Sequence, residues 1–453
     1  MKRGNIWTGR FPFVGLFIVI WVILGVGCEQ KQGCKDPEAL NYDPEAQVDD
    51  GSCVYQAGPI VYAFVRDELS SVSYEKQALQ NLLIQDIRTK ITQLAEAGAQ
   101  AIVLQDFLDL YEMLPTYQGM TLADVAPFEP LSSTYTDIET DANLQASLAN
   151  SHASTADTDL RTWFEIIANN SQNVTKLGTS AVYTTSNNPP YGDGLDLKEM
   201  ITQTLLGAVV YHRGVSYLES IADYDNSSLI EGQNYTEMEH YWDEAFGYWG
   251  GAQAYFTFSD EALANLDGAL SYNDHNGDAK IDFATEYNYV FAREAGTRDL
   301  IDNVGSNPAG TDFSRVLFTA FIEGRKAIIR TDITKRQETE ETILNVWEEL
   351  IAATCIHYIN LLEVDMSYIG TSQEDIPVLN RNWSAMKSWI AMLKYNSNIH
   401  LTKLIEVCED MGEAPVYYTP GSLEADAYLL RLDIIKSVFQ TTYGFSDTQM
   451  QEW

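Results

Sequence analysis

The sequence predicts an all-α protein, a helical bundle of one domain or of two packed lobes. Apolar residues recur three and four positions apart over most of residues 56–453, whereas alternating strand patterns are few. Connections of moderate length separate the helical segments, and such connections favour antiparallel neighbours in a bundle. Apolar residues make up 45% of the chain, which is an ordinary share for a folded protein with a core.

The first 27 residues have the pattern of a signal peptide. Three basic residues lie among the first ten, and an apolar run follows from Phe11 to Gly27. The run ends in Leu24-Gly-Val-Gly-Cys28, which resembles the lipobox of bacterial lipoproteins, although Gly25 stands where Leu is usual. The resemblance implies cleavage before Cys28, acylation of its thiol and a lipidated linker over residues 28–33. An uncleaved anchor is the alternative. In either case the chain is attached to a membrane, and the residues after the anchor are expected to lie outside the cytoplasm.

Residues 34–55 predict a small acidic module bounded by cysteines. The segment from Cys34 to Cys53 resembles a short motif of secreted bacterial proteins, with the pattern Cys-x-Asp-Pro, Ala-x-Asn-Tyr-x-Pro-x-Ala and Asp-Asp-Gly-Ser-Cys. A loop this short cannot bury a core, so a disulfide or an ion must hold it together. We expect Cys34 and Cys53 to pair. Cys355 and Cys408 either pair as well or remain free, because Cys355 lies on an apolar helical face.

The remaining residues, 56–453, predict the helical domain. In its first long helical segment, residues 74–97, leucine and isoleucine recur at helical spacing. One short strand is expected at residues 60–65, and the longest connections fall at residues 129–157 and 169–194. Further helices are expected at residues 101–114, 160–168, 195–221, 236–248, 285–302, 312–331, 338–362, 380–408 and 422–443.

The charge balance excludes one class of partner. Acidic residues number 65 and basic residues 28, so the formal net charge is −37. Nucleic-acid binding depends on basic residues that neutralise phosphates, and we therefore expect no nucleic-acid partner. The same balance disfavours binding to anionic lipid surfaces, and it favours cations or simple solubility in a salty exterior.

A helix is predicted to begin after Thr236. Thr236 is a suitable N-cap residue, and Glu239 three positions later completes a capping box. On this helix Glu237, His240 and Glu244 share one face, because side chains three and four positions apart lie one above the other. The aromatic residues of the segment are expected to pack in the core.

This helix face is a candidate metal site. Helical bundles present metal ligands as Glu-x-x-His pairs, and imidazole and carboxylate groups suit transition metals. Asp243 is a further candidate ligand, although it lies about 100° around the helix from Glu244. We therefore predict iron or another transition metal at Glu237, His240, Asp243 and Glu244, completed by ligands from other helices. The alternative is a His240 that is hydrogen-bonded to an acid and packed against aromatic rings.

A second acidic motif resembles the calcium loop of EF-hand and dockerin modules. Alternate residues of such a loop wrap oxygen ligands around a hard cation. Ala279 stands at position 6, where Gly is usual, and the closing acid comes one residue late as Glu286. The alternative is a polar turn before a helix that begins near Thr285. The expected calcium ligands at positions 1, 3, 5, 7 and 9 are Asp274, Asn276, Asp278, the carbonyl of Lys280, and Asp282.

The order of several motifs resembles a family of uncharacterised bacterial lipoproteins, known only as a domain of unknown function, over most of residues 60–400. Leu206-Gly-Ala-Val-Val-Tyr211 and Trp242-Asp-Glu-Ala-Phe-Gly247 carry the resemblance, the second most specifically. That family is similar in character to the imelysin-like lipoproteins, helical envelope proteins linked to iron uptake and marked by a His-x-x-Glu motif. Here the spacing gives His240-x-x-Asp243. The likeness implies an outer-membrane lipoprotein, periplasmic or surface-exposed, with an outer-membrane receptor as partner.

Together these features predict a lipid-anchored cell-envelope protein that binds a metal cation or a metal-containing ligand during uptake. The first alternative is a structural or interaction lipoprotein that calcium stabilises. The less favoured alternative is a metal-dependent hydrolase, which needs an open coordination position. The sequence contains neither His-Glu-x-x-His nor Gly-x-Ser-x-Gly, so a binding role is favoured over catalysis.

Overall fold

The computed structural model describes residues 31–33, 46–49, 60–95, 99–113, 142–149, 153–172, 193–265, 271–302, 312–395 and 401–453. The chain divides into two units, Met1–Gly58 and Pro59–Trp453. In the first unit two short strands, β1 (Gln32–Gly33) and β2 (Val48–Asp49), pair in parallel. Cys28, Cys34 and Cys53 lie outside the described residues, so the predicted lipidation and disulfide stay predictions.

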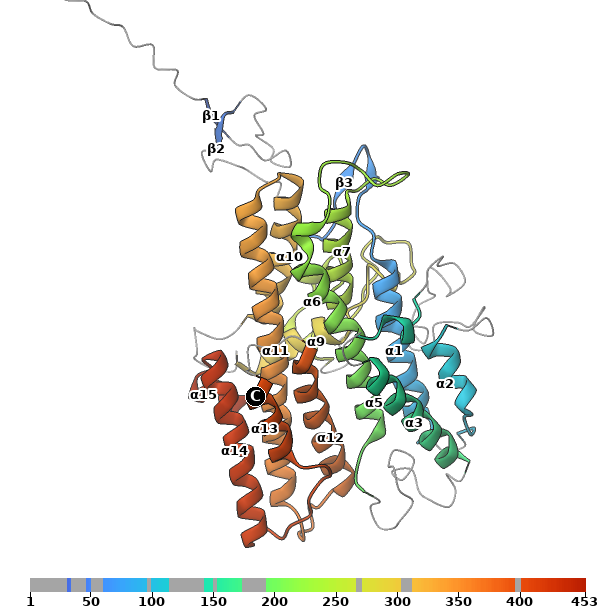
Figure 1. Cartoon of the computed structure of the whole chain (residues 1–453), viewed down its shortest axis with the longest axis vertical. Helices are drawn as coiled ribbons and strands as arrows, with labels where there is room; N and C mark the ends of the chain where they lie inside the picture. Colours follow the sequence, from blue (N-terminus) through green and yellow to red (C-terminus); the bar gives the residue numbers. More distant parts are fainter. Residues whose placement is uncertain are drawn as a thin grey trace, which may run out of the picture. The chain divides into compact units, whose positions relative to one another are not determined.

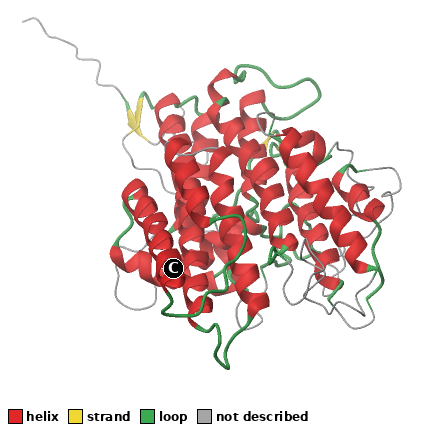
Figure 2. Ribbon diagram, turned by 60° about the horizontal axis from the view of Figure 1, so that its bottom comes forward, coloured by secondary structure: helices red, strands yellow, loops and turns green. Residues whose placement is uncertain are grey.

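Helices dominate the second unit (Figures 1 and 2), which confirms the all-α prediction. None of the helices within the described ranges is long and apolar enough to span a membrane. The helices in chain order are α1 (Glu75–Gln93), α2 (Leu104–Tyr111), α3 (Ala153–Ser171), α5 (Leu197–Leu205), α6 (His212–Glu219), α7 (Glu237–Trp249), α8 (Asp260–Leu263), α9 (Val290–Asp302), α10 (Phe313–Ile329), α11 (Ile333–Ser367), α12 (Ile376–Met392), α13 (Leu401–Met411), α14 (Leu423–Tyr443) and α15 (Asp447–Glu452).

The long helix α11 organises the packing of this unit. Helix α10 packs along one part of α11 and α12 along another, while α7 packs between α6, α10 and α1. Figure 1 shows α10 and α11 side by side, with α7 and α6 next to them. The core is rich in large aromatic side chains, and each fully buried one removes a large apolar surface from water. The fully buried tryptophans are Trp242, Trp249, Trp347, Trp383 and Trp389.

The strand expected at residues 60–65 is wrong in extent. In this part of the chain, β3 (Val65–Arg66) and β4 (Leu69–Ser70) pair as an antiparallel hairpin, whose turn residues Asp67 and Glu68 have φ values of 51° and 65°. Tyr62 and Phe64 are buried in the core of the helical unit. Their apolar alternation therefore reflects packing against helices by an extended segment, and strand pairing begins only at Val65.

The helices expected at 160–168 and 338–362 are longer than predicted, as α3 and α11, and three others differ in how they are built. The helix expected at 195–221 is continuous but contains a π-helical stretch, Leu206–Tyr211, between α5 and α6. The helix expected from residue 285 begins at Val290, because residues 282–289 form turns closed by polar side chains. The helix expected at 380–408 is split into α12 and α13. Cys355 and Cys408 are both free thiols, so the disulfide considered between them is absent from the structure.

The closest approach of α7 to α10 requires a glycine, and this generates a prediction. A Cβ atom at position 324 would collide with the indole of Trp242 and would lie 2.7 Å from Thr339 Oγ1. We expect Gly324→Ala to lower the free energy of unfolding by about 1–3 kcal/mol, the usual cost of overpacking a core. Urea denaturation measures this change. Thr319→Ala, at an exposed position of the same helix, is the matched control, and equal effects of the two substitutions would contradict the packing argument.

Candidate functional site

Helix α7 starts as the sequence predicts, and its first turn fixes the surrounding acids. Thr236 Oγ1 accepts the amide of Glu239 at 3.2 Å, and Glu239 Oε2 accepts the amide of Thr236 at 2.8 Å. This reciprocal capping box confirms the predicted start of the helix. The helix ends at Gly250, whose φ of 82° is left-handed. The capping bond holds the Glu239 carboxylate at the protein interior, where it is fully buried.

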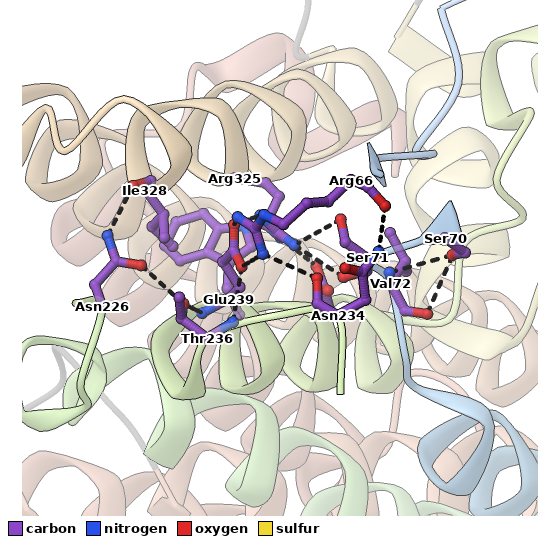
Figure 3. Close-up of polar contacts among 12 residues, drawn as sticks. Arg66, Ser70, Ser71, Val72, Asn226, Asn234, Thr236, Glu239, Arg325 and Ile328 are labelled. Carbon is purple, nitrogen blue, oxygen red and sulfur yellow. Dashed lines mark hydrogen bonds and ion pairs between the residues drawn. The ribbon is translucent and has the colours of Figure 1, made fainter. Parts of the chain in front are cut away.

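Two arginines converge on that carboxylate. Arg66 donates from Nη1 and Nη2 to the two oxygens of Glu239, at 2.8 and 2.7 Å. Arg325 on α10 donates from Nη1 to Glu239 Oε1 at 2.8 Å and from Nη2 to the carbonyl of Ser71 at 3.0 Å. Figure 3 shows these groups meeting between α7, α10 and the segment after β4. Burial acts to raise the pKa of Glu239, but the bonds from Arg66 and the charge of Arg325 hold it below its usual range.

Asp243 is the second acid that Arg325 binds. Its Oδ1 accepts Arg325 Nε at 2.9 Å and the Tyr62 hydroxyl at 2.6 Å. Its other oxygen, Oδ2, is buried and has no hydrogen-bond partner among the described residues. Burial therefore raises the pKa of Asp243 to about 6, against the lowering charge of Arg325. The Tyr62 ring also stacks on Phe246, with ring centroids 3.7 Å apart, so Asp243 lies within a packed structural contact.

His240 and Glu244 form a separate pair further along α7. His240 Nε2 lies 3.6 Å from Glu244 Oε1, and that oxygen accepts Gln77 Nε2 from α1 at 2.6 Å. His240 Nδ1 and Glu244 Oε2 are buried atoms without hydrogen-bond partners in the part of the chain that the structure describes. The His240 ring stacks on Tyr235 at 4.9 Å. This pair combines the predicted ligand types with the predicted alternative of a packed, acid-bonded histidine.

The four predicted α7 ligands thus divide into different environments. His240 and Glu244 lie together, Asp243 binds Arg325 and Tyr62, and Glu237 Oε2 accepts the amide of Asp225 at 3.1 Å. Over the described ranges, no three His, Cys, Asp or Glu side chains converge as a metal-binding group. A transition metal on α7 would therefore start from two side chains and recruit its other ligands from water or from a bound molecule.

The loop from Asp274 folds around its own side-chain oxygens. Asp274 Oδ1 accepts the amides of Gly277 at 2.6 Å and Asp278 at 3.1 Å, and its Oδ2 accepts the amide of Ala279 at 2.8 Å. Asn276 Oδ1 accepts the amide of Asp278 at 2.8 Å, and Asp278 Oδ1 accepts the amide of Lys280 at 2.9 Å. Residues at positions 1, 3 and 5 of the predicted calcium loop therefore turn their oxygens toward the loop backbone.

Two further features of the loop bear on the predicted calcium site. Ala279, at position 6, has φ of 63°, in the left-handed region that Gly normally occupies at this position. Glu286 is buried and spans the loop, since Oε1 accepts the amides of His275 and Asn276 at 2.8 and 3.0 Å and Oε2 accepts the amide of Asp282 at 2.9 Å. The helix expected from Thr285 is absent here, so the loop is closed by an acid within a turn.

Sequence reasoning missed the arginines that hold α7. Arg325 lies on an apolar stripe of α10, between the buried residues Phe321 and Ile328. A lone arginine in such a stripe signals a buried acid elsewhere, because an unpaired buried charge is costly. The identity of that acid was not readable from the sequence, since Glu239 and Asp243 lie more than 80 positions away. Tyr62 and Arg66 carried no such signal.

Comparison with known proteins places the chain in a family. The family model described as a domain of unknown function (DUF4856) matches residues 59–373. This match covers more than half of the chain, and the chain belongs to that family. The matched region contains α7, the loop from Asp274 and α10, which agrees with the resemblance to an uncharacterised family. No curated protein and no solved structure shows significant similarity to the chain.

Removing Arg325 tests whether the α7 acids are structural. Arg325→Met leaves the buried Asp243 with Tyr62 alone, and breaking a buried ion pair from one side costs about 3–5 kcal/mol of unfolding free energy. Guanidinium denaturation measures the loss, and adding Asp243→Asn in the same chain should recover part of it. Arg315→Met on the same helix, with 73% of its side chain exposed, should change stability by about 0.5 kcal/mol or less. A similar small effect at Arg325 would refute the structural role.

Proposed function

We propose that this chain is a lipid-anchored protein of the bacterial cell envelope that binds cations, with calcium held in the loop from Asp274 to Glu286. The observation that carries the calcium assignment is the folded loop itself. Its side-chain oxygens at positions 1, 3 and 5 accept successive backbone amides, and Ala279 takes the left-handed backbone at position 6. The lipobox-like segment before Cys28 supports the anchor.

The loop has the oxygen donors that calcium prefers, but no three of its acids converge in the described structure, so calcium binding requires them to move together. Calcium takes six to eight oxygen ligands from carboxylates, amides, carbonyls and water. Each carboxylate oxygen has two lone pairs, so Asp274 Oδ2 and Asp278 Oδ1, which each accept one amide, can also bind a cation. The amide bonds then serve to preorganise the donors. Residues 274–280 are exposed, whereas Glu286 is buried. An ion would therefore enter the loop from the solvent, with Glu286 on the inner side of the site.

The position of the loop supports a stabilising role for the ion. The loop is followed by Tyr287 and Asn288, and Asn288 Oδ1 accepts the amide of Ala252 at 2.7 Å directly after α7. The backbone of Tyr289 also donates to Gly250 at 2.8 Å. Ion binding at the loop would therefore strengthen the connection between the end of α7 and the start of α9. This favours calcium as a structural ion within a binding or interaction protein.

A second candidate function is uptake of a transition metal, such as iron, through α7. The observation in its favour is the pair of buried atoms without hydrogen-bond partners among the described residues, His240 Nδ1 and Glu244 Oε2, on adjacent turns of one helix. The pair alone does not complete a site, so we propose that a metal-containing ligand, rather than a bare ion, supplies the remaining donors. An outer-membrane receptor would be the corresponding partner.

Calcium binding is tested by unfolding the purified protein after exhaustive removal of metals. At a calcium concentration about 100 times the dissociation constant, binding should raise the unfolding free energy by about 2.7 kcal/mol. Asp278→Asn removes one charge but keeps the oxygen that accepts the Lys280 amide, so it should weaken calcium binding without lowering the stability of the calcium-free protein. Asp433→Asn, at an exposed position on α14, is the control. No stabilisation up to about 10 mM calcium, beyond the range of weak extracellular sites, would rule out the assignment.

The α7 hypothesis predicts a metal dependence that resides in His240. Elemental analysis after dialysis against iron, zinc or copper should give bound metal in the wild-type protein. His240→Ala should lower the affinity of the protein for the metal at least about tenfold, since even substitutions of residues that only support the ligands lower metal affinity by that factor. His275→Ala, an exposed histidine in the calcium loop, controls for incidental imidazole binding. Equal metal content in both variants would remove α7 as the site.

A further inference from the structure

Arg325 and Arg298 are the most deeply buried arginines among the described residues, and their surroundings differ. Arg325 is 0% exposed, and its guanidinium donates to Glu239, Asp243 and Ser71. Arg298 on α9 is 2% exposed, yet its Nε and Nη1 atoms meet no acceptor among the described residues. Buried N–H groups are rarely left in this state, because each loses its water without gaining a partner. The first arginine is explained by folding, and the second is not.

The acids beside Arg298 give it one long ion pair and no hydrogen bond. Glu294 Oε2 lies 3.7 Å from Arg298 Nε, which is beyond hydrogen-bond distance. Asp299, the next residue in the chain, uses both carboxylate oxygens to accept the amides of Phe313 and Ser314, at 2.7 and 2.8 Å, at the start of α10. Burial consequently lowers the pKa of Arg298 from its usual value. The guanidinium therefore keeps two N–H groups without acceptors among the described residues, beside one carboxylate at 3.7 Å.

The side chains opposite Arg298 come from α11 and supply no negative charge. His357 Nδ1 lies 2.8 Å from the carbonyl oxygen of Trp453, and burial with the charge of Arg298 lowers the pKa of His357 to about 3. Tyr358 is next in sequence, and burial raises its pKa. Both groups are neutral at physiological pH. They can share a hydrogen bond with a bound molecule but cannot pair with the guanidinium.

Partly exposed polar side chains lie near Arg298 and Tyr358. Tyr358 lies within electrostatic reach of Arg298 and Glu294 on α9, and of Arg88 and Glu199 on α1 and α5. Arg88 is paired with Glu199 through bonds of 2.8 and 2.7 Å, and 36% of its side chain remains exposed. The Glu294 side chain is 23% exposed, and Tyr358 is partly exposed. Accessible polar groups thus lie near a guanidinium that is itself enclosed.

We propose that Arg298 is the base of a binding site for a small oxyanion, a carboxylate or a phosphate, between α9 and α11. An oxyanion offers acceptors to the guanidinium, and charge-assisted hydrogen bonds of this kind are the strong ones in proteins. Arginine suits both groups because its planar donors match their geometry. Tyr358 and His357 add neutral hydrogen-bonding groups, and the site is distinct from the loop at Asp274 and from α7.

The test compares oxyanions with chloride on the full-length protein. Thermal unfolding is followed in sodium phosphate and, separately, in sodium acetate, each balanced with sodium chloride to constant ionic strength. We expect at least one oxyanion to raise the melting temperature by about 3 °C at saturation, and the more effective one identifies phosphate or carboxylate as the ligand chemistry. Arg298→Met should abolish this shift, whereas Arg315→Met, at an exposed position on α10, should retain it.

Either of two results would overturn the oxyanion site. One is that neither oxyanion changes the melting temperature of the wild-type protein relative to chloride. The other is that Arg298→Met shows the same change in melting temperature. Replacement of a buried, poorly paired charge by an apolar isostere is often neutral or stabilising, so Arg298→Met should fold. Should it fail to fold, Arg298→Lys keeps the charge but loses the planar donors. Inorganic phosphate and acetate are then titrated into Arg298→Lys and into the wild-type protein by calorimetry. The oxyanion that stabilises the wild-type protein must bind the variant at least tenfold more weakly.

Discussion

The buried contact of Arg325 with Glu239 and Asp243 is the interaction on which the arrangement of the helical unit depends. It joins α10 to α7, and through Ser71, Arg66 and Tyr62 it joins both helices to the extended segment that precedes α1. Removing such charges from water is costly. The cost is offset because the guanidinium donates to two carboxylates and one carbonyl in the same place. This geometry fixes the rotation of α7 about its axis, and therefore which of its residues face outward.

That rotation determines which α7 residues remain for function. Glu239 and Asp243 face the arginines, whereas His240 and Glu244 lie toward Gln77 of α1 and the aromatic ring of Tyr235. A motif that contains four acids and a histidine in sequence is thus divided by the helix into a structural side and a partly exposed side. The density of acids in the motif overstates its capacity for metal binding, since Glu239 and Asp243 are paired with Arg66 and Arg325. Of the other groups only His240 and Glu244 lie together, and they set the limit on any metal hypothesis at α7.

The sequence predicts the helices well where an apolar stripe and a cap agree. The start of α7 follows from Thr236 and Glu239, which are local to the backbone they satisfy. The start of α9 is misplaced because Asn288 and Glu286 bind backbone groups of neighbouring turns, and such bonds override helical periodicity. The partners of the α7 acids could not be predicted from the sequence, because Arg66 and Arg325 lie 173 and 86 positions from Glu239. Only the three-dimensional packing brings them together.

Arg325 and Arg298 show how a buried charge that serves folding differs from one that folding does not explain. Folding alone accounts for Arg325, because every acceptor it needs comes from the chain. The same reasoning applied to Arg298 leaves Nε and Nη1 without hydrogen-bond acceptors among the described residues, since Glu294 forms an ion pair but lies too far away for a hydrogen bond. Folding could have placed an apolar side chain there at lower cost. A buried guanidinium that the fold does not satisfy is therefore better explained by an anion from outside the chain than by the stability of the bundle.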